Sequence, residues 1–161
     1  MATGRTVGKY CKVQVDDLTA LRDIPVMTIA GVGINYDEVD VSAIQEAVKG
    51  VLAGQGNSSI TITGPFDNTA VGTASGTGEA AVLSGSHTVL SALAGGNTPF
   101  TFAVYFGIRG FWATGDPVFG GANMWICSDY TVDDAAGTYS AKISHAGVST
   151  MPAWGTAVIA A

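Results

Sequence analysis

Short segments in which apolar and polar residues alternate with a period of two recur along the chain, and this pattern constrains the fold most. The segment SSITIT (58–63) places Ile60 and Ile62 on one face and hydroxyl side chains on the other. The segments TYSAKISH (138–145) and PFTFAVYFGI (99–108) alternate in the same way. A period of two is typical of a β-strand with one buried face. We therefore predict a chain built mainly from strands.

Three further segments extend this prediction. KYCKVQV (9–15) alternates, and IPVMTIAGVGINY (24–36) is rich in β-branched residues, with Gly31 and Gly33 predicted to bend the chain. NMWICSDY (123–130) is apolar on both sides, which favours a central strand. Turn-forming sequences separate the segments: Asp16–Asp17, WATGDP (112–117) and DDAAG (133–137).

The segment DVSAIQEAVKGVL (40–52) is the strongest candidate for a helix. Ser42 and Gln45 fit a capping box, and Gly54 is placed to end the helix. Gly50 opposes it at a cost of about 1 kcal/mol relative to alanine. Apolar residues follow helical spacing, so we predict packing on the sheet through Ile44, Val48, Val51 and Leu52.

Two neighbouring segments complete the helix prediction. Asp37, Glu38 and Asp40 would lie at the positive end of this helix dipole, where carboxylates are stabilised. A second, shorter helix is predicted in HTVLSALAGG (87–96), ended by Gly95–Gly96.

The pattern as a whole predicts one fold class. It is mainly β (α+β), a β-sandwich or open barrel of about seven to eight strands with one flanking α-helix. The length of 161 residues favours a single domain, residues 1–161.

The run NTAVGTASGTGEAAVLSGS (68–86) has little apolar periodicity and many glycines. Ordering it costs on the order of 1–2 kcal/mol per residue in backbone entropy. Val71, Val82 and Leu83 are its only sizeable apolar side chains, too few to recover that cost within the subunit. We therefore expect the run to be mobile in a free monomer and to become ordered against another subunit.

Charge is scarce, since charged residues make up 12% and hydrophobic residues 47% of the chain. A surface with so little charge favours coverage by other copies. The net charge of −6 and the scattered seven basic residues argue against binding to nucleic acid through phosphates.

No catalytic, cofactor or metal site is predicted. His87 lies beside Ser84 and Ser86, but the G-x-S-x-G elbow is missing, and His145 has no evident partner. We interpret both histidines as structural. No enzyme activity follows from the sequence.

The two cysteines and the acidic residues at 37–40 likewise favour no metal site. Cys11 and Cys127 lie far apart in apolar contexts, which favours buried thiols, with a disulfide or a metal pair as the alternative. Asp37, Glu38 and Asp40 lack the spacing of a calcium loop.

The order of the parts resembles that of a phage tail tube protein, the major tail protein of long-tailed, non-contractile phages. The resemblance extends from about residue 9 to residue 157, and segments 40–65 and 124–154 carry most of it. It implies a β-sandwich-like fold with a flanking helix. It also implies hexameric rings, joined through their inner sheets, that stack into a hollow tube.

The resemblance further implies partners and a location. The tube would surround the tape-measure protein, contact tail initiator and terminator proteins, and let double-stranded DNA pass without sequence-specific binding. The excess of acidic residues would repel DNA and keep it from adhering to the tube. The protein would be assembled in the host cytoplasm and reside in the virion tail. MATGRTVGKY lacks a signal-peptide layout, and no apolar run is long enough to span a membrane, in keeping with that expectation.

In this family a long loop and the terminal arms grip the neighbouring ring. The resemblance therefore assigns ring-to-ring contacts to the loop 68–86 and to arms at residues 1–8 and 148–161. The candidate contact residues in the loop are Asn68, Val71, Glu79, Val82 and Leu83.

Two alternatives remain open. A phage capsid decoration protein is also β-rich and poor in charge, but it forms discrete knobs on a shell. A soluble binding module resembling a lectin would expose an aromatic cluster, for which Phe106, Phe111 and Trp112 are the candidates. Packing in a core or an interface is the favoured interpretation of these aromatic residues.

Overall fold

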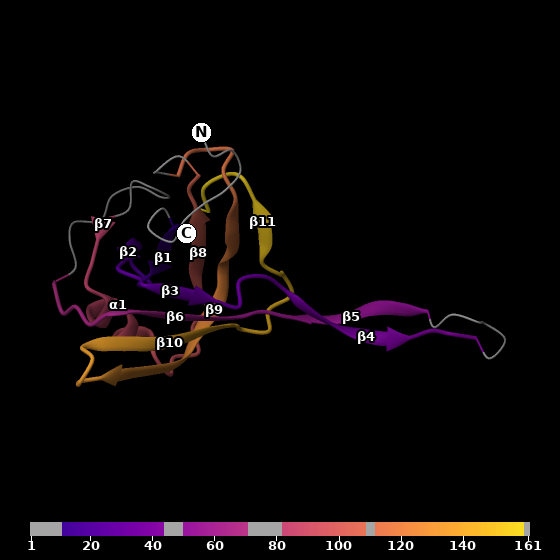
Figure 1. Ribbon diagram of the computed structural model, residues 1–161, viewed down its shortest axis with the longest axis horizontal. Coiled ribbons are helices and arrows are strands. Elements are labelled where there is room, and N and C mark those ends of the chain that lie inside the picture. The colour runs from indigo at the N-terminus through magenta and orange to yellow at the C-terminus, as the bar shows by residue number, and fades with distance from the viewer. Residues whose placement is uncertain (1–10, 44–49, 71–81, 109–111, 160–161) are drawn as a thin grey trace.

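The computed structural model describes residues 11–43, 50–70, 82–108 and 112–159 (Figure 1). These residues form eleven strands and one α-helix. In chain order the elements are β1 (Cys11–Asp16), β2 (Leu21–Ile24), β3 (Thr28–Ala30), β4 (Asn35–Asp40), β5 (Val51–Asn57), β6 (Ser59–Pro65), β7 (Val82–Leu83), α1 (Ser86–Leu93), β8 (Phe100–Phe106), β9 (Val118–Asp133), β10 (Thr138–His145) and β11 (Ala153–Gly155).

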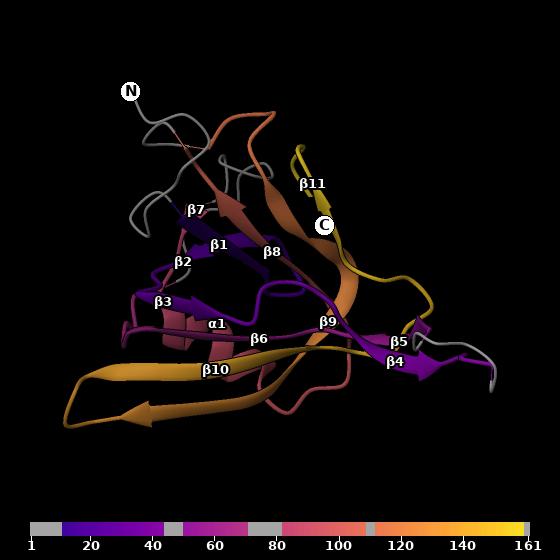
Figure 2. The same ribbon diagram turned by 45° about the vertical axis from the view of Figure 1, so that its right-hand side comes forward.

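Nine strands form one sheet with the order β3-β6-β10-β9-β8-β1-β2-β7, and β11 pairs with β9. All pairs are antiparallel except β2 with β7. The long strand β9 pairs with β8 near its start and with β10 near its end, and it bends from one layer of the sheet to the other (Figure 2).

The sheet is rolled on itself. Strands β2 and β3 lie near opposite ends of the strand order, yet only residues 25–27 connect them. The Met27 N–H donates to the Thr63 carbonyl (2.7 Å), and the Tyr139 hydroxyl donates to the Pro25 carbonyl (2.8 Å). These bonds hold the connection against β6 and β10, which brings the two ends of the sheet together as in an open barrel.

The alternating side chains of the strands fill the inside of the roll. The core residues come from β1, β2, β6, β8, β9 and β10, and α1 adds Val89, Leu90 and Leu93. Ile60 and Ile62 are fully buried, as the alternation of SSITIT predicts. Each fully buried aliphatic or phenyl side chain contributes about 1.5–3 kcal/mol, so this core dominates the stability of the fold.

A smaller cluster covers the outer side of β8. It contains Ala103, Tyr105, Trp112 and Val118, with Ile159 packed against it. The Trp112 indole N–H donates to the carbonyls of Asp116 and Pro117 (3.2 Å each), and the Ile159 N–H donates to the Tyr105 hydroxyl (3.1 Å). Trp112 is therefore a packing residue, Phe106 is half-buried, and Phe111 lies outside the described residues.

The predicted fold class and most predicted strands are confirmed. Segment 138–145 forms β10 with the expected bounds, and 123–130 lies in the central strand β9. Gly31 and Gly33 adopt positive φ angles of 81° and 132° where the chain bends. The short helix predicted near residues 87–96 is α1, and Gly95 follows it with φ 76°.

The longer helix predicted over residues 42–52 is wrong in the part that the structure describes. Val51 and Leu52 begin strand β5, with exposed fractions of 46% and 60%. The Ser42 hydroxyl accepts the N–H of Gly50 (2.6 Å), the residue that precedes β5. Ile44 and Val48 lie outside the described residues.

The acidic residues before this segment are also placed differently. Asp37, Glu38 and Asp40 lie in strand β4, which pairs with β5. Glu38 and Asp40 pair with Ala53 and Val51, and Asp37 lies at a shift in the register. The helix dipole that was expected to stabilise these carboxylates is therefore not what places them. The apolar spacing of residues 43–52 fits a helix, but the pairing between 35–40 and 51–57 prevails.

Candidate functional site

Strands β4 and β5 form a separate two-stranded sheet that extends away from the rolled sheet (Figure 1). Val39 pairs with Leu52, and Tyr36 pairs with Gly56. All residues of β4 and most of β5 are exposed. This β4–β5 hairpin is the largest element of the described chain that lies outside its core.

The two faces of the hairpin differ. Val39 and Leu52 are paired and share one face, and Val41 follows Val39 by two residues. Tyr36 precedes Glu38 by two residues and lies on the other face. A Cβ at Gly56 would lie 2.8 Å from the Tyr36 ring, so glycine permits this side chain to lie flat on β5. We call Val39, Val41 and Leu52 the hairpin ridge. All three are large and exposed.

Two carboxylates lie on the opposite face of the hairpin. Glu38 and Asp40 pair with Ala53 and Val51 and lie away from the ridge, whereas Asp37 precedes Val39 by two residues and shares its face. The backbone N–H of Ser42 donates to Asp40 (2.9 Å), and this bond, followed by that of the Ser42 hydroxyl, lowers the pKa of Asp40. Asp40 is therefore ionised at neutral pH.

An exposed apolar ridge of this kind is typical of an interaction surface. A two-stranded hairpin alone is marginally stable in water. Contiguous exposed apolar side chains on a protein surface mark protein–protein contacts when polar residues surround them. The amphipathic hairpin therefore points to a site of association and not to a site of chemistry.

A second apolar surface lies at the seam of the rolled sheet. Cys11, Val26, Ile29, Val32 and Phe106 are half-buried and, with Met27 and Trp154, line a cavity of about 410 Å³. Met27 and Trp154 stand at its rim, with exposed fractions of 66% and 56%. The Trp154 ring lies 5.7 Å from that of Phe106 and 5.0 Å from that of Phe119. We call this cavity the seam groove.

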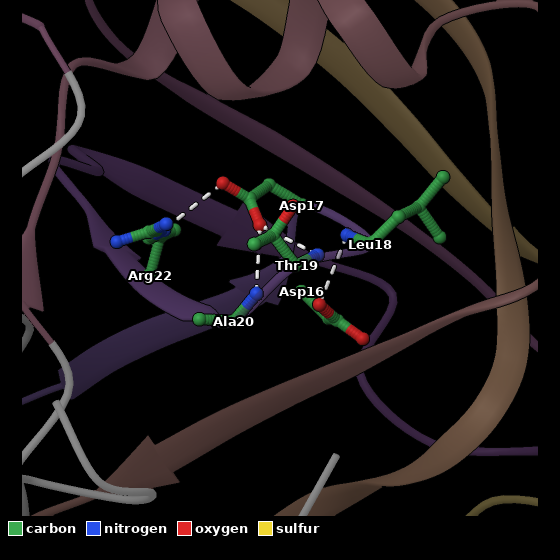
Figure 3. Close-up of polar contacts among 6 residues, drawn as sticks. All are labelled: Asp16, Asp17, Leu18, Thr19, Ala20 and Arg22. Atoms are coloured by element: carbon green, nitrogen blue, oxygen red, sulfur yellow. Dashed lines mark hydrogen bonds and ion pairs between the residues drawn. The ribbon is translucent and has the colours of Figure 1, made fainter. Parts of the chain in front are cut away.

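The acidic turn after β1 is structural (Figure 3). Asp17 accepts the N–H groups of Thr19 and Ala20 (2.9 Å each) and pairs with the Arg22 Nε (2.9 Å). Asp16 accepts the Leu18 N–H (2.9 Å), which holds Leu18 at φ 70°. Burial raises the pKa of Asp16 despite that bond. The sequence prediction of a turn here is confirmed.

Neither histidine forms a catalytic dyad with a serine in the described residues. Ser86 donates to the Pro65 carbonyl (2.9 Å) and accepts the Asp67 N–H (3.2 Å). His87 Nδ1 bonds the Tyr130 hydroxyl (2.9 Å). His145 Nε2 donates to the Thr150 carbonyl (2.7 Å), while its Nδ1 accepts the Gly147 N–H (3.1 Å). The His87 ring joins α1 to β9, and the His145 ring joins β10 to the loop that follows it.

The acidic residues and the cysteines were the other candidates for a metal or redox site. In the described part of the chain no group of three or more His, Cys, Asp or Glu residues is placed to hold a metal ion. Cys11 and Cys127 form no disulfide, and burial raises the pKa of the Cys127 thiol. No described helix is long and apolar enough to cross a membrane.

The predicted loop contacts are only partly described. Asn68 is exposed in irregular structure, while Val71 and Glu79 lie outside the described residues. Val82 and Leu83 form β7, whose backbone pairs with Arg22 and Asp23 of the same subunit. This pairing narrows the predicted inter-subunit segment to residues 68–81.

The sequence analysis missed the hairpin and the groove. The glycines at 50, 54 and 56 oppose a helix and were a usable signal against it. The groove had no comparable signal because its residues come from β1, β3, β8, β11 and the connections between them.

No protein-family model matches this chain, and no curated protein is similar to it. Several solved structures nevertheless share its fold. A chain in the structure of the sheath/tube terminator of PVC, an extracellular contractile injection system, matches with a TM-score of 0.59 at 12% identity. The match covers 96% of this chain and 99% of the other.

Two related assemblies give similar results. A chain in the tube-terminating cap of the anti-feeding prophage matches with a TM-score of 0.59 at 12% identity, over 98% of this chain and 95% of that one. A chain in the PVC sheath–tube complex matches with a TM-score of 0.55 at 11% identity, over 97% and 95%. Nearly the whole chain thus shares the fold of chains from PVC and the anti-feeding prophage.

Proposed function

We propose that this chain is a structural subunit of a phage-like tail tube, which associates with copies of itself into rings that stack around a channel. The observation that carries this proposal is the hairpin ridge. Its apolar side chains are exposed on an element that extends from the subunit. Burying them against another subunit would supply about 25 cal/mol for each Å² of apolar surface removed from water.

The shared fold supports the tail assignment. The similar structures come from contractile injection systems, whereas the sequence resemblance named the tube of long-tailed, non-contractile phages. The proposal therefore rests on the fold common to tail-like tubes and no longer on one tail type. Hexameric rings, a tape-measure protein inside the tube, and initiator and terminator partners remain parts of the proposal.

The charge distribution supports a channel that does not retain its cargo. Glu38 and the ionised Asp40 occupy the face of the hairpin opposite to the ridge. If the ridge packs on a neighbour, this acidic face stays in water, and a net charge of −6 per subunit repels passing DNA. Residues 68–81, with Asn68, Val71 and Glu79, remain the proposed ring-to-ring contact.

A terminator that ends a tube is the second candidate, because two of the similar structures are a terminator and a cap. Such a protein forms one ring, while a tube protein forms many stacked rings. The capsid decoration alternative predicts discrete small oligomers on a shell.

Electron microscopy of the purified protein, with sedimentation velocity over a range of concentrations, tests the proposal. We expect rings that stack into tubes as the concentration rises. Single rings at all concentrations would favour the terminator, and discrete trimers the decoration protein. A monomer at every concentration would overturn self-assembly altogether.

A further inference from the structure

His145 lies where the β4–β5 hairpin joins the rolled sheet, at the end of β10 (Figure 2). Its backbone N–H donates to the carbonyl of Ser58 (3.0 Å), the residue between β5 and β6. Its ring bonds the loop 146–152 that leads to β11. We propose that these two ring bonds, which we call the His145 latch, hold the loop against the root of the hairpin (residues 34–36 and 56–58), and that protonation of the ring breaks the latch. This inference concerns contacts within one subunit and goes beyond the proposed function.

The two ring bonds require a neutral imidazole. Nδ1 accepts the Gly147 N–H (3.1 Å), and Nε2 donates to the Thr150 carbonyl (2.7 Å). A neutral imidazole offers one acceptor and one donor, whereas a protonated imidazole offers two donors. A protonated ring would therefore point an N–H group at the N–H of Gly147. Keeping the Thr150 bond forces Gly147 away, and swinging the ring away from Gly147 gives up Thr150.

The loop depends on this ring for its position. In the described part of the chain, the hydrogen bonds of residues 147–151 go to the His145 ring alone. Gly147 turns the chain back towards the ring at φ 80°, a left-handed conformation that suits glycine. Val148 packs against the core and Pro152 is buried, so the loop stays attached at both ends when the ring bonds break. The residues between these two anchors are the ones that protonation releases.

Met151 connects the loop to the hairpin root. A Cβ at Gly56 would lie 3.1 Å from the terminal methyl of Met151, so this methyl packs over Gly56. The same Cβ would lie 2.8 Å from the Tyr36 ring and 3.0 Å from a methyl of Ile34, which places Met151 in one cluster with both. Met151 directly follows Thr150, whose carbonyl the ring bonds. Displacement of the loop therefore loosens the packing at the hairpin root.

The surroundings of His145 leave its ring as the group that changes charge near neutral pH. Histidine is the side chain whose charge ordinarily changes between about pH 5 and about pH 8. On β9, Trp125 lies opposite His145, and the next residue on that face is Cys127, whose thiol stays neutral because burial raises its pKa. The charged residues Lys142 and Asp129 pair with each other beyond the bulge between β9 and β10. The loop 146–151 and the β5–β6 junction contain no charged residue.

The latch gives the hairpin a response to pH. A two-stranded hairpin is marginally stable in water, so its orientation depends on the contacts at its root. In the proposed tube the hairpin lies at an interface, and breaking the latch would then weaken assembly in acid.

The two histidines of the chain provide a matched test. Amide hydrogen exchange of the full chain is measured with rates corrected for the intrinsic effect of pH. We expect opening of residues 146–151 and of the hairpin root to increase at least about fivefold from about pH 7.5 to about pH 5.5, the equivalent of one hydrogen bond. His145→Gln should abolish this change, because glutamine does not titrate. His87→Gln, which removes the other imidazole, should retain it.

A second variant tests the connection through Met151. Met151→Ala should speed exchange at the hairpin root at both pH values and leave the pH response of Gly147 intact. Val132→Ala, at another exposed site, should behave as the wild type. In the wild type, the midpoint of the exchange response should coincide with the titration of the His145 ring protons, followed by NMR.

Three results would overturn the inference. They are a wild type without the pH response, a response that survives His145→Gln or has a different midpoint from the His145 ring, and a response of the loop that does not reach the hairpin root. The measurements report on contacts inside the subunit, so they decide the inference whether or not tubes form. Electron microscopy and sedimentation decide the proposed function separately.

Discussion

The rolled sheet and the β4–β5 hairpin are both antiparallel strand structures, but they differ in what covers their apolar side chains. In the roll, Ile60 and Ile62 of β6 are fully buried in the same core cluster as residues of β1, β8 and β10. In the hairpin, Val39 and Leu52 face each other across two strands and remain exposed. The same alternation therefore serves the subunit's own core in one region and, as we propose, an interface in the other.

The comparison shows that a chain with few charged residues can bury some apolar residues in its own core and leave others exposed. The roll holds enough buried surface to fold alone. The hairpin contains Gly54 and Gly56 and is a single layer whose residues are mostly exposed. Its strands therefore gain little stability from packing against their own subunit. The predictions below test this division, from the largest expected effect to the smallest.

A charge placed in the core of the roll should abolish folding. Ile62→Asp buries an unpaired carboxylate at a fully buried position. The cost of several kcal/mol is comparable with a total stability of roughly 5–15 kcal/mol. Circular dichroism and thermal unfolding would measure the loss. A cooperative transition close to that of the wild type would contradict the placement of Ile62 in the core.

Removal of the carboxylate from the turn after β1 should cost less. Asp17→Ala leaves the Arg22 side chain, which is 7% exposed, without this ion pair. We expect a loss of about 3 kcal/mol, the lower end for breaking a buried pair, measured by urea unfolding. Asp133→Ala is the matched control, since Asp133 also accepts turn N–H groups but is exposed. Equal losses for both variants would show that the ion pair contributes nothing.

The same charge on the hairpin should leave the subunit stable and stop assembly. Leu52→Asp lies at an exposed site, so we expect the free energy of unfolding to change by no more than about 0.5 kcal/mol. Sedimentation velocity should show monomers where the wild type forms rings or tubes. Tubes built by this variant at wild-type concentrations would remove the ridge from the interface.

Two carboxylates, one in each region, should respond to pH in opposite directions, with the smallest effect on stability. Burial raises the pKa of Asp16, so its contribution is fully present below its unfolded pKa and is lost as the pH rises through its folded pKa. Hydrogen bonds from Ser42 lower the pKa of Asp40, so its contribution is present above its unfolded pKa and is lost as the pH falls through its folded pKa.

Urea unfolding of Asp16→Asn and Asp40→Asn from about pH 7 to about pH 3 would measure both effects against the wild type. The wild type should gain stability over Asp16→Asn as the pH falls. It should lose its advantage over Asp40→Asn in the same direction. Parallel curves for the two variants would contradict the difference in their environments.

Much of the fold was determined by the sequence alone. The alternation in SSITIT and TYSAKISH produced β6 and β10, because a strand with one buried face needs that period. The aspartates at 16–17 and at 133 marked turns, because their short side chains bond nearby N–H groups. The scarcity of charge predicts that other copies cover part of the surface, and this stays a prediction.

The tertiary structure alone decided the hairpin and the groove. Residues 43–52 have apolar spacing that fits a helix, but the Val39–Leu52 pairing and the Ser42–Gly50 bond place the described ends of this segment in an antiparallel hairpin. Periodicity within one segment carries no information about which strand lies beside it. The seam groove joins Cys11, Ile29, Phe106 and Trp154 only because the sheet rolls on itself and brings distant strands to one seam.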